Sequence, residues 1–195
     1  MLINRCGKSH PIIIYMGIVL YFWLDKHHHM EICYLLLGSN TGDRLAYLEK
    51  AAQAVSKFAG PVSLYSSIYE TEPWGFDDDT AFLNQVIEIR TTVQAAELMR
   101  KILVAETILG RLRSPDSTGY ISRTIDIDLL FYGQHIIARP GLTIPHPRLH
   151  RRRFTLVPLA EIAPGLFHPV LKSTIAQLER ICPDKLSVIK YGGNR

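Results

Sequence analysis

The stretch RTIDIDLL, residues 123–130, alternates polar and aliphatic residues as a β-strand with one buried face does. Asp126 and Asp128 point to one face of such a strand, and the aliphatic residues beside them point to the other. The aliphatic face must pack on helices, so the two carboxylates share the opposite face, about 7 Å apart along the strand. Two carboxylates at this spacing suit a hard cation, and the expected metal is Mg²⁺.

The acidic pair alone leaves a second interpretation open, because an Asp-x-Asp pair on an exposed strand is often two solvated carboxylates without a ligand. Nearby arginines favour the metal interpretation. Arg111, Arg113 and Arg123 border one loop, and guanidinium groups bind phosphate through paired hydrogen bonds. A dicarboxylate beside three arginines indicates a magnesium polyphosphate, and ATP is the natural candidate. The sequence has neither the P-loop motif nor the glycine loop of protein kinases.

Hydrophobic periodicity on both sides of this strand predicts an α+β fold. The expected order is strand, helix, strand, strand, helix, strand, at residues 32–37, 43–60, 62–70, 82–92, 94–109 and 123–132. This βαββαβ order is typical of a ferredoxin-like sandwich, an antiparallel sheet with both helices on one face. The other face is expected to be open. A C-terminal extension with a short strand pair and two helical segments is predicted after residue 133.

The composition limits the classes of protein to which the chain can belong. The chain has 195 residues, of which 47% are hydrophobic and 21% charged, as expected for one folded domain. Three widely spaced cysteines predict no disulfide framework and favour the reducing cytoplasm. The net charge of +4 suits a polyanionic ligand and falls short of a nucleic-acid-binding arm.

Residues 1–29 differ from the rest of the chain. An apolar run at 11–24 is shorter than the ~20 residues that a spanning helix needs, and no small-residue cleavage site follows it. We expect that translation begins at Met30, that residues 1–29 lie outside the fold, and that one domain covers 30–195. No membrane attachment is expected.

A third group of residues surrounds the second and third strands. The stretch YETEPWG at 69–75 is followed by FLN at 82–84, in which Phe82 and Asn84 share the face opposite Leu83. An aromatic ring for stacking and an amide for hydrogen bonds to a ring edge would suit a flat heterocycle. The alternative is that the aromatic residues of these stretches are ordinary core residues.

Taken together, these stretches resemble the hydroxymethyl-dihydropterin pyrophosphokinase family of folate biosynthesis. The resemblance covers nearly all of residues 32–186 and rests on LGSN at 37–40, SSIYETEPWG at 66–75, FLN at 82–84, GRLR at 110–113, RTIDIDLL at 123–130 and IPHPRLHRRRF at 144–154. It implies transfer of the β,γ-diphosphate of ATP to the hydroxymethyl group of 6-hydroxymethyl-7,8-dihydropterin, with release of AMP.

The resemblance also implies a role for each matching residue. Asp126 and Asp128 would hold two magnesium ions and act in catalysis with Arg111 and Arg123. The implied ATP contacts are Glu106, Arg111, Arg113, Arg123, Leu129, Thr143, His146 and Arg152. The implied pterin contacts are Thr71, Trp74, Phe82, Asn84, Tyr120 and Phe154, with the two phenylalanines on either side of the ring.

An RNA-binding module is the main alternative, since RNA-recognition folds share the sandwich order and a basic balance. Carboxylates on the open face oppose it, because they would repel RNA. The family resemblance implies a cytoplasmic monomer with no nucleic-acid partner, whose product passes to the next enzyme of the folate pathway. The Gly-, Ser- and Pro-rich segment 114–122 is predicted to close over bound ATP.

Overall fold

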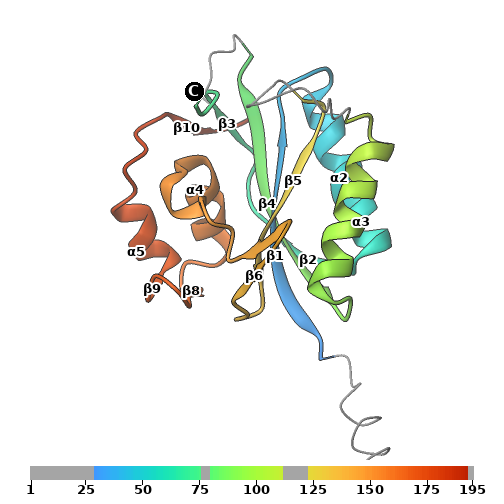
Figure 1. Cartoon of the computed structure of the whole chain (residues 1–195). Coiled ribbons are helices and arrows are strands. Elements are labelled where there is room, and N and C mark those ends of the chain that lie inside the picture. Colours follow the sequence, from blue (N-terminus) through green and yellow to red (C-terminus); the bar gives the residue numbers. More distant parts are fainter. Residues whose placement is uncertain (1–28, 76–79, 112–122, 193–195) are drawn as a thin grey trace, which may run out of the picture.

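The computed structural model describes residues 29–75, 80–111 and 123–192, and a six-stranded antiparallel sheet forms its centre. From one edge, the strands follow in the order β10 (Val188–Lys190), β3 (Tyr69–Thr71), β4 (Phe82–Thr91), β1 (Glu31–Ser39) and β5 (Asp126–Tyr132). The sixth strand, β2 (Val62–Tyr65), pairs with the far end of β4. The chain therefore has a mixed α and β fold around an antiparallel sheet (Figure 1).

Strand β1 lies between β4 and β5 and is buried on both faces, which explains its continuous apolar run. Leu35 and Leu37 belong to the core on one face of the sheet, and Tyr34 and Leu36 belong to a second core on the other face. A central strand covered on both sides needs apolar residues at consecutive positions rather than at alternate ones.

Helices α2 (Arg44–Phe58) and α3 (Ala95–Ile108) cover one face of the sheet, to the right in Figure 1. Each presents an apolar stripe at helical spacing, including Leu48 and Val55 on α2 and Leu98 and Ile102 on α3. Ile127 and Leu129 of β5 complete this core, as the alternation in its sequence predicted.

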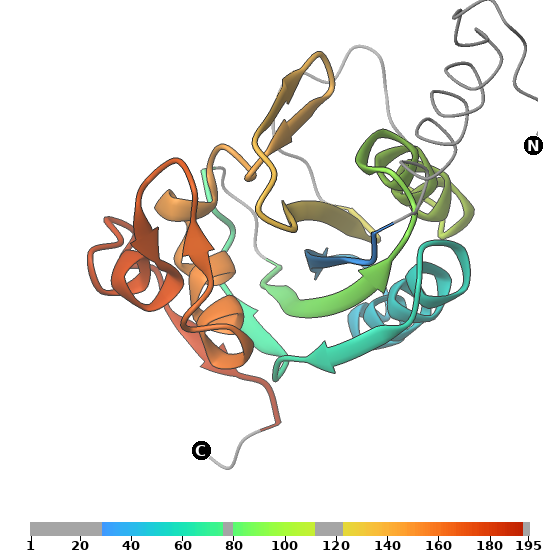
Figure 2. The same ribbon diagram turned by 90° about the horizontal axis from the view of Figure 1, so that it is seen from below.

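The prediction that the second face of the sheet is open is wrong where the C-terminal helices pack on it. Helices α4 (Arg153–Ile162) and α5 (Ile175–Arg180) pack there with the 3-10 turn η1 (Leu149–Arg151). Figure 2 shows the sheet as a curved layer with α2 and α3 outside it and α4 on its other side. The segment expected to be an extension thus forms a third layer, because its apolar residues bury the second face. The part of that face that stays open carries the cavity described below.

Several predicted boundaries also shift. The predicted strand 62–70 is two strands, β2 and β3, and the strand expected at 123–132 begins at Asp126. The structure adds β10, which pairs with β3 and was not predicted. Two hairpins complete the chain, β6 (Ile137–Arg139) with β7 (Leu142–Ile144) and β8 (Phe167–His168) with β9 (Ser173–Thr174). None of the helices in the described ranges combines the length and apolar character needed to cross a membrane.

Asp43 caps the N-terminus of α2, and the contribution of this cap to stability can be measured. The Asp43 carboxylate accepts a hydrogen bond from the backbone N–H of Ala46 at 3.1 Å. Asp43→Ala is expected to lower the free energy of unfolding by about 1 kcal/mol, the usual effect of removing such a cap. Urea denaturation would measure it, with Glu49→Ala on the exposed side of α2 as the matched control. Equal stabilities of the two variants would contradict the cap's role.

Candidate active site

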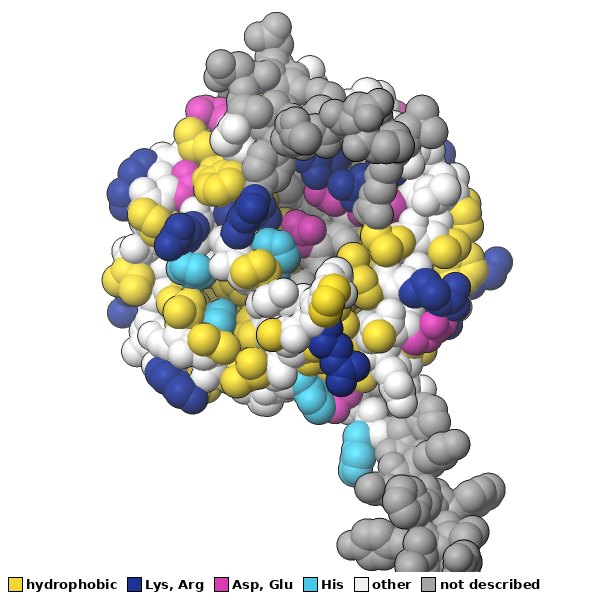
Figure 3. Space-filling model, viewed as in Figure 1, with side chains coloured by type: hydrophobic (Ala, Val, Ile, Leu, Met, Phe, Trp, Pro, Cys, Tyr) yellow, Lys and Arg dark blue, Asp and Glu magenta, His cyan; other side chains and the backbone are white. Residues whose placement is uncertain are grey.

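A cavity of about 240 Å³ opens on the second face of the sheet, beside the end of β1. Four strands, β1, β3, β4 and β5, contribute to its walls together with α3 and the start of α4. In the space-filling view, acidic side chains lie inside a hollow and basic side chains lie around it (Figure 3). The cavity is therefore polar and charged at one end, and its remaining walls hold the aromatic residues.

Gly38 lies on the floor of this cavity, between its two ends. It is in register with Asn84 on β4 at one side and with Asp126 on β5 at the other. A Cβ atom at Gly38 would lie 3.1 Å from the Asn84 amide oxygen and 3.9 Å from the Phe82 ring. The glycine thus leaves room for both side chains. Since neighbouring strands are about 4.8 Å apart, the amide and the carboxylate stand on backbones about 10 Å apart.

The charged end is built around Asp126. Arg111 and Arg123 each donate to a different oxygen of its carboxylate, and Arg111 also donates to Glu106. The buried Glu106 carboxylate accepts a second hydrogen bond, from the backbone N–H of Ile127 at 2.8 Å, which ties α3 to β5. Burial opposes ionisation of Asp126, but the two arginines outweigh it, so its pKa is lowered. This carboxylate is ionised at neutral pH.

Asp128 is the less neutralised of the two carboxylates. Burial, followed by the charge of Asp126, raises the pKa of its carboxyl to about 6. The guanidinium of Arg152 lies 3.5 Å from an Asp128 oxygen. His146 lines the same wall, and burial, followed by the charge of Arg152, lowers the pKa of its imidazole to about 4, so it is neutral at pH 7. A cation placed between the two aspartates would relieve their repulsion.

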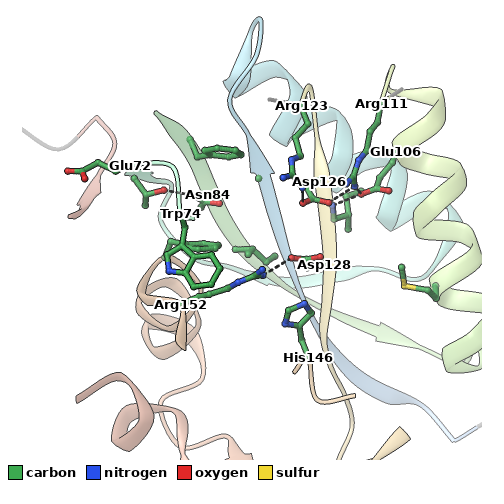
Figure 4. Close-up of a pocket in the computed structure, with 17 residues that line it drawn as sticks. Glu72, Trp74, Asn84, Glu106, Arg111, Arg123, Asp126, Asp128, His146 and Arg152 are labelled. Carbon is green, nitrogen blue, oxygen red and sulfur yellow. Dashed lines mark hydrogen bonds and ion pairs between the residues drawn. The ribbon is translucent and has the colours of Figure 1, made fainter. Parts of the chain in front are cut away.

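The other end of the cavity is aromatic. The rings of Trp74 and Phe154 lie with centroids 6.5 Å apart, and the Arg152 guanidinium stacks 5.1 Å from the first and 5.6 Å from the second. The Asn84 amide donates to the Thr71 hydroxyl at 2.7 Å, and both side chains are buried. Figure 4 shows Trp74 and Asn84 on one side, the cluster around Asp126 on the other, and Arg152 reaching toward Asp128.

Most of the residues predicted from the sequence line this one cavity. They are Thr71, Trp74, Phe82, Asn84, Glu106, Arg111, Arg123, Asp126, Asp128, His146, Arg152 and Phe154. Two others do not. The Leu129 side chain packs in the core under the helices, because it points away from the carboxylates, and Thr143 lies exposed on β7. Arg113, Tyr120 and the segment 114–122 lie outside the described residues.

Five lining residues were not predicted: Leu36, Gly38, Glu72, Met99 and Ile127. Two of them had a signal in the sequence. Gly38 is the one residue without a side chain in an otherwise bulky buried strand, and Met99 stands seven positions before Glu106, on the same side of α3. The other three, Leu36, Glu72 and Ile127, had no such signal, because their places in the cavity wall follow from how the strands pair.

Known proteins resemble this chain in the region that builds the cavity. A family model described as 7,8-dihydro-6-hydroxymethylpterin-pyrophosphokinase (HPPK) matches residues 34–164, which include every lining residue. The chain belongs to this family. The match ends two residues after α4, so it covers most of β1, strands β2 to β5 and helices α2 to α4, and it leaves out β10 and α5.

Two bacterial relatives named 2-amino-4-hydroxy-6-hydroxymethyldihydropteridine pyrophosphokinase agree with HPPK membership. The protein of Aquifex aeolicus (strain VF5) is 36% identical over 77% of this chain and 91% of its own length. That of Bacillus subtilis (strain 168) is 42% identical over 68% of this chain and 78% of its own length. The comparisons give no support to the RNA-binding alternative.

Solved structures agree in fold. Wild-type Plasmodium falciparum HPPK-DHPS with SDX-DHP aligns with a TM-score of 0.63 at 18% identity, over 77% of this chain and 44% of that chain. An HPPK-DHPS structure in complex with substrates gives a TM-score of 0.62 at 15% identity, over 77% and 43%. The HPPK chain described here thus spans less than half of those proteins. At such identities the likeness shows a shared fold alone.

Proposed function

We propose that this chain transfers the β,γ-diphosphate of ATP to the hydroxymethyl group of 6-hydroxymethyl-7,8-dihydropterin and releases AMP, as a step of folate biosynthesis. The observation that carries the proposal is one cavity with a dicarboxylate and two arginines at one end and aromatic rings with a buried amide at the other. Membership of the pyrophosphokinase family, whose relatives carry that activity in their names, supports it. ATP is the co-substrate.

Asp126 and Asp128 fit a magnesium site. Their side chains are 22% and 30% exposed, both face the cavity, and both are on one strand. Among the described residues no cluster of three or more acidic, histidine or cysteine side chains could cage a metal, so the remaining ligands would come from phosphate and water. Such a site suits Mg²⁺, which is held by one or two carboxylates together with substrate phosphates. When bound, Mg²⁺ neutralises the charge of the transferred group; we propose two ions.

Charge balance supports the same conclusion. The described lining of the cavity holds four carboxylates, Glu72, Glu106, Asp126 and Asp128, against three arginines, Arg111, Arg123 and Arg152. A triphosphate brought into this lining without cations would meet net negative charge. With magnesium ions bound to Asp126 and Asp128, the acidic end of the cavity would attract phosphate.

Arg111 and Arg123 are the proposed phosphate ligands. Arg111 is held between Asp126 and Glu106, and the backbone of Arg123 is fixed by the buried Asn40, which accepts from its N–H at 2.8 Å. A guanidinium held in place costs little reorganisation when charge develops during transfer. His146 and Arg152 line the wall toward the nucleotide, while Arg113, outside the described residues, is proposed as a further phosphate ligand.

The aromatic end is the proposed pterin site. Phe82 and Phe154 would face the two sides of the flat ring, and Trp74 would form its rim. The Thr71–Asn84 hydrogen bond fixes the orientation of the amide, whose other polar atoms can pair with the ring edge. With the ring held there, the hydroxyl of the pterin alcohol would point toward the carboxylates, and the two reactants would lie in line. No covalent nucleophile is needed, because phosphoryl-type transfer depends on positioning and charge neutralisation.

The finer fold and domain assignments are also proposals. We assign the elements from β1 to β5 to a ferredoxin-like βαββαβ arrangement, supported by the strand order around β4 and β1, and residues 133–192 to its C-terminal extension. The catalytic domain is residues 30–195, and residues 1–29 lie outside it. It acts as a cytoplasmic monomer that passes its product to the next folate enzyme. Deleting residues 1–29 is expected to leave kcat unchanged; a loss of activity would contradict this assignment.

An AMP-release assay tests the proposed function. Purified protein with ATP and 6-hydroxymethyl-7,8-dihydropterin is expected to release AMP only when Mg²⁺ is present, and EDTA is expected to stop the reaction reversibly. Filter binding of RNA serves as the parallel test of the alternative. Retention of RNA with no AMP release would refute the pyrophosphokinase proposal.

A further inference from the structure

Arg44, the first residue of α2, joins two segments that flank the aromatic end of the cavity. Its Nη1 atom donates to the backbone carbonyl oxygen of Ala81 at 2.7 Å and to the Glu70 carboxylate at 3.0 Å. The Arg44 and Glu70 side chains are 23% and 35% exposed, so the contact is partly shielded from water. Arg44 does not line the cavity and takes no part in the site described above.

The two residues held by Arg44 each stand next to a residue of the proposed pterin site. Glu70 directly precedes Thr71, and Ala81 directly precedes Phe82. Thr71 and Phe82 are paired across β3 and β4, and this pair is the last one of that ladder. The end of a two-strand ladder opens more easily than its middle, because pairing supports it on one side only. Arg44 therefore fastens the ladder at the end where both strands enter the cavity.

The guanidinium suits this role because it presents several donors in one rigid plane. One group thus satisfies a backbone carbonyl on one segment and a carboxylate on the other. The backbone of Arg44 is held at the start of α2, because Asp43 caps this helix. We call the two hydrogen bonds of Arg44, to Glu70 and to Ala81, the clasp. The clasp connects α2, β3 and the start of β4 at one point.

We propose that Arg44 is a positioning residue for the pterin. It keeps Thr71 and Phe82 at the separation at which Phe82 stacks on the pterin ring and the Thr71–Asn84 pair can hydrogen-bond to the ring edge. This inference rests on the proposed function. Asp126 and Asp128 stand on β5, which is separated from β4 by β1. Loss of the clasp therefore weakens pterin binding and leaves the nucleotide end of the cavity in place.

Steady-state kinetics of Arg44→Gln test the proposal. The KM for the pterin alcohol is expected to rise about tenfold, while kcat and the KM for ATP change less than about twofold. Arg44→Lys, which keeps the charge and part of the donor set, is expected to show a smaller rise. The matched control is Arg100→Gln, which removes another Arg–Glu ion pair, with Glu97 at 2.6 Å, on the exposed side of α3. The control should leave both KM values unchanged.

A double-mutant cycle separates a positioning role of Arg44 from a general effect on stability. Arg44 and Glu70 act through one contact, so the double variant Arg44→Gln, Glu70→Ala should raise the pterin KM no further than Arg44→Gln alone. Additive effects, equal changes in both KM values, or an unchanged pterin KM would overturn the proposal. Should Arg44→Gln fail to fold, the same comparison is made with Arg44→Lys and Glu70→Ala. A wild-type protein that releases no AMP would instead refute the proposed function.

Discussion

Asparagine in place of Asp128 is expected to lower kcat for AMP release by about a thousandfold, the order of effect seen when one charge-stabilising group is removed from a transfer site. The side chain keeps its size and one oxygen atom, but it loses the negative charge that holds a divalent cation. Asp126 alone would leave the cation one carboxylate, whose charge is already partly neutralised by Arg111 and Arg123. Single-turnover measurement of AMP at saturating Mg²⁺ would give the change in the chemical step.

The same substitution is expected to leave the free energy of unfolding within about 1 kcal/mol of wild type in the absence of Mg²⁺. Asparagine removes the repulsion between two nearby carboxylates, which offsets the loss of the 3.5 Å contact between Asp128 and Arg152. Because Asp128 is partly buried rather than fully exposed, both the lost repulsion and the lost contact affect the free energy of unfolding. Glu49→Gln on α2 serves as the control for a neutralised carboxylate away from the cavity. Severe unfolding of the Asp128 variant would indicate a structural role instead.

Alanine in place of Arg123 is expected to lower kcat by about a hundredfold and to leave the KM for the pterin alcohol unchanged. The Arg123 guanidinium faces the charged end of the cavity, where it meets Asp126, and the aromatic end lies across β1. Removing one fixed cation from a site that stabilises the charge developing during transfer lowers kcat by about this factor. Paired kinetics with each substrate varied in turn would separate kcat from the two KM values.

The variant Arg123→Lys tests whether the donor geometry of Arg123 contributes to kcat in addition to its charge. A lysine keeps the charge but lacks the planar pair of donors that binds phosphate in two places, so it should recover only part of the lost kcat. Arg100→Ala, on the exposed side of α3, should behave as wild type. Wild-type kcat in Arg123→Ala, or a rise in the pterin KM alone, would contradict the assignment of Arg123 to the phosphate end.

The alternation in residues 123–130 was enough to place Asp126 and Asp128 on the same face, because side-chain direction in a regular strand has a strict period of two. That rule fails farther along β5. Tyr34 pairs with Phe131 but Leu35 pairs with Leu129, so Leu130 is an extra residue and both Leu130 and Phe131 face the second core. Such a bulge depends on the partner strand and has no local sequence signal here.

Other parts of the site depend on contacts distant in sequence. The Arg151–Arg153 run contains three arginines, and only packing of α4 against the sheet shows that the middle one, Arg152, is buried against the rings of Trp74 and Phe154. The third layer, which packs on the second face, was missed because short helices after residue 133 resemble an appendage until their partner surface is known. Gly38 stands out in the sequence as part of the LGSN motif, and its place between Asn84 and Asp126 follows from strand register.

The proposed activity requires that the two carboxylates of β5 hold Mg²⁺ on the nucleotide. Isothermal titration of a nonhydrolysable ATP analogue into wild type, with and without Mg²⁺, and into the double variant Asp126→Ala, Asp128→Ala tests it most directly. We expect tight binding to wild type that requires Mg²⁺, and at least about a hundredfold weaker binding to the double variant. Mg²⁺-dependent binding of equal strength in both proteins would contradict the claim.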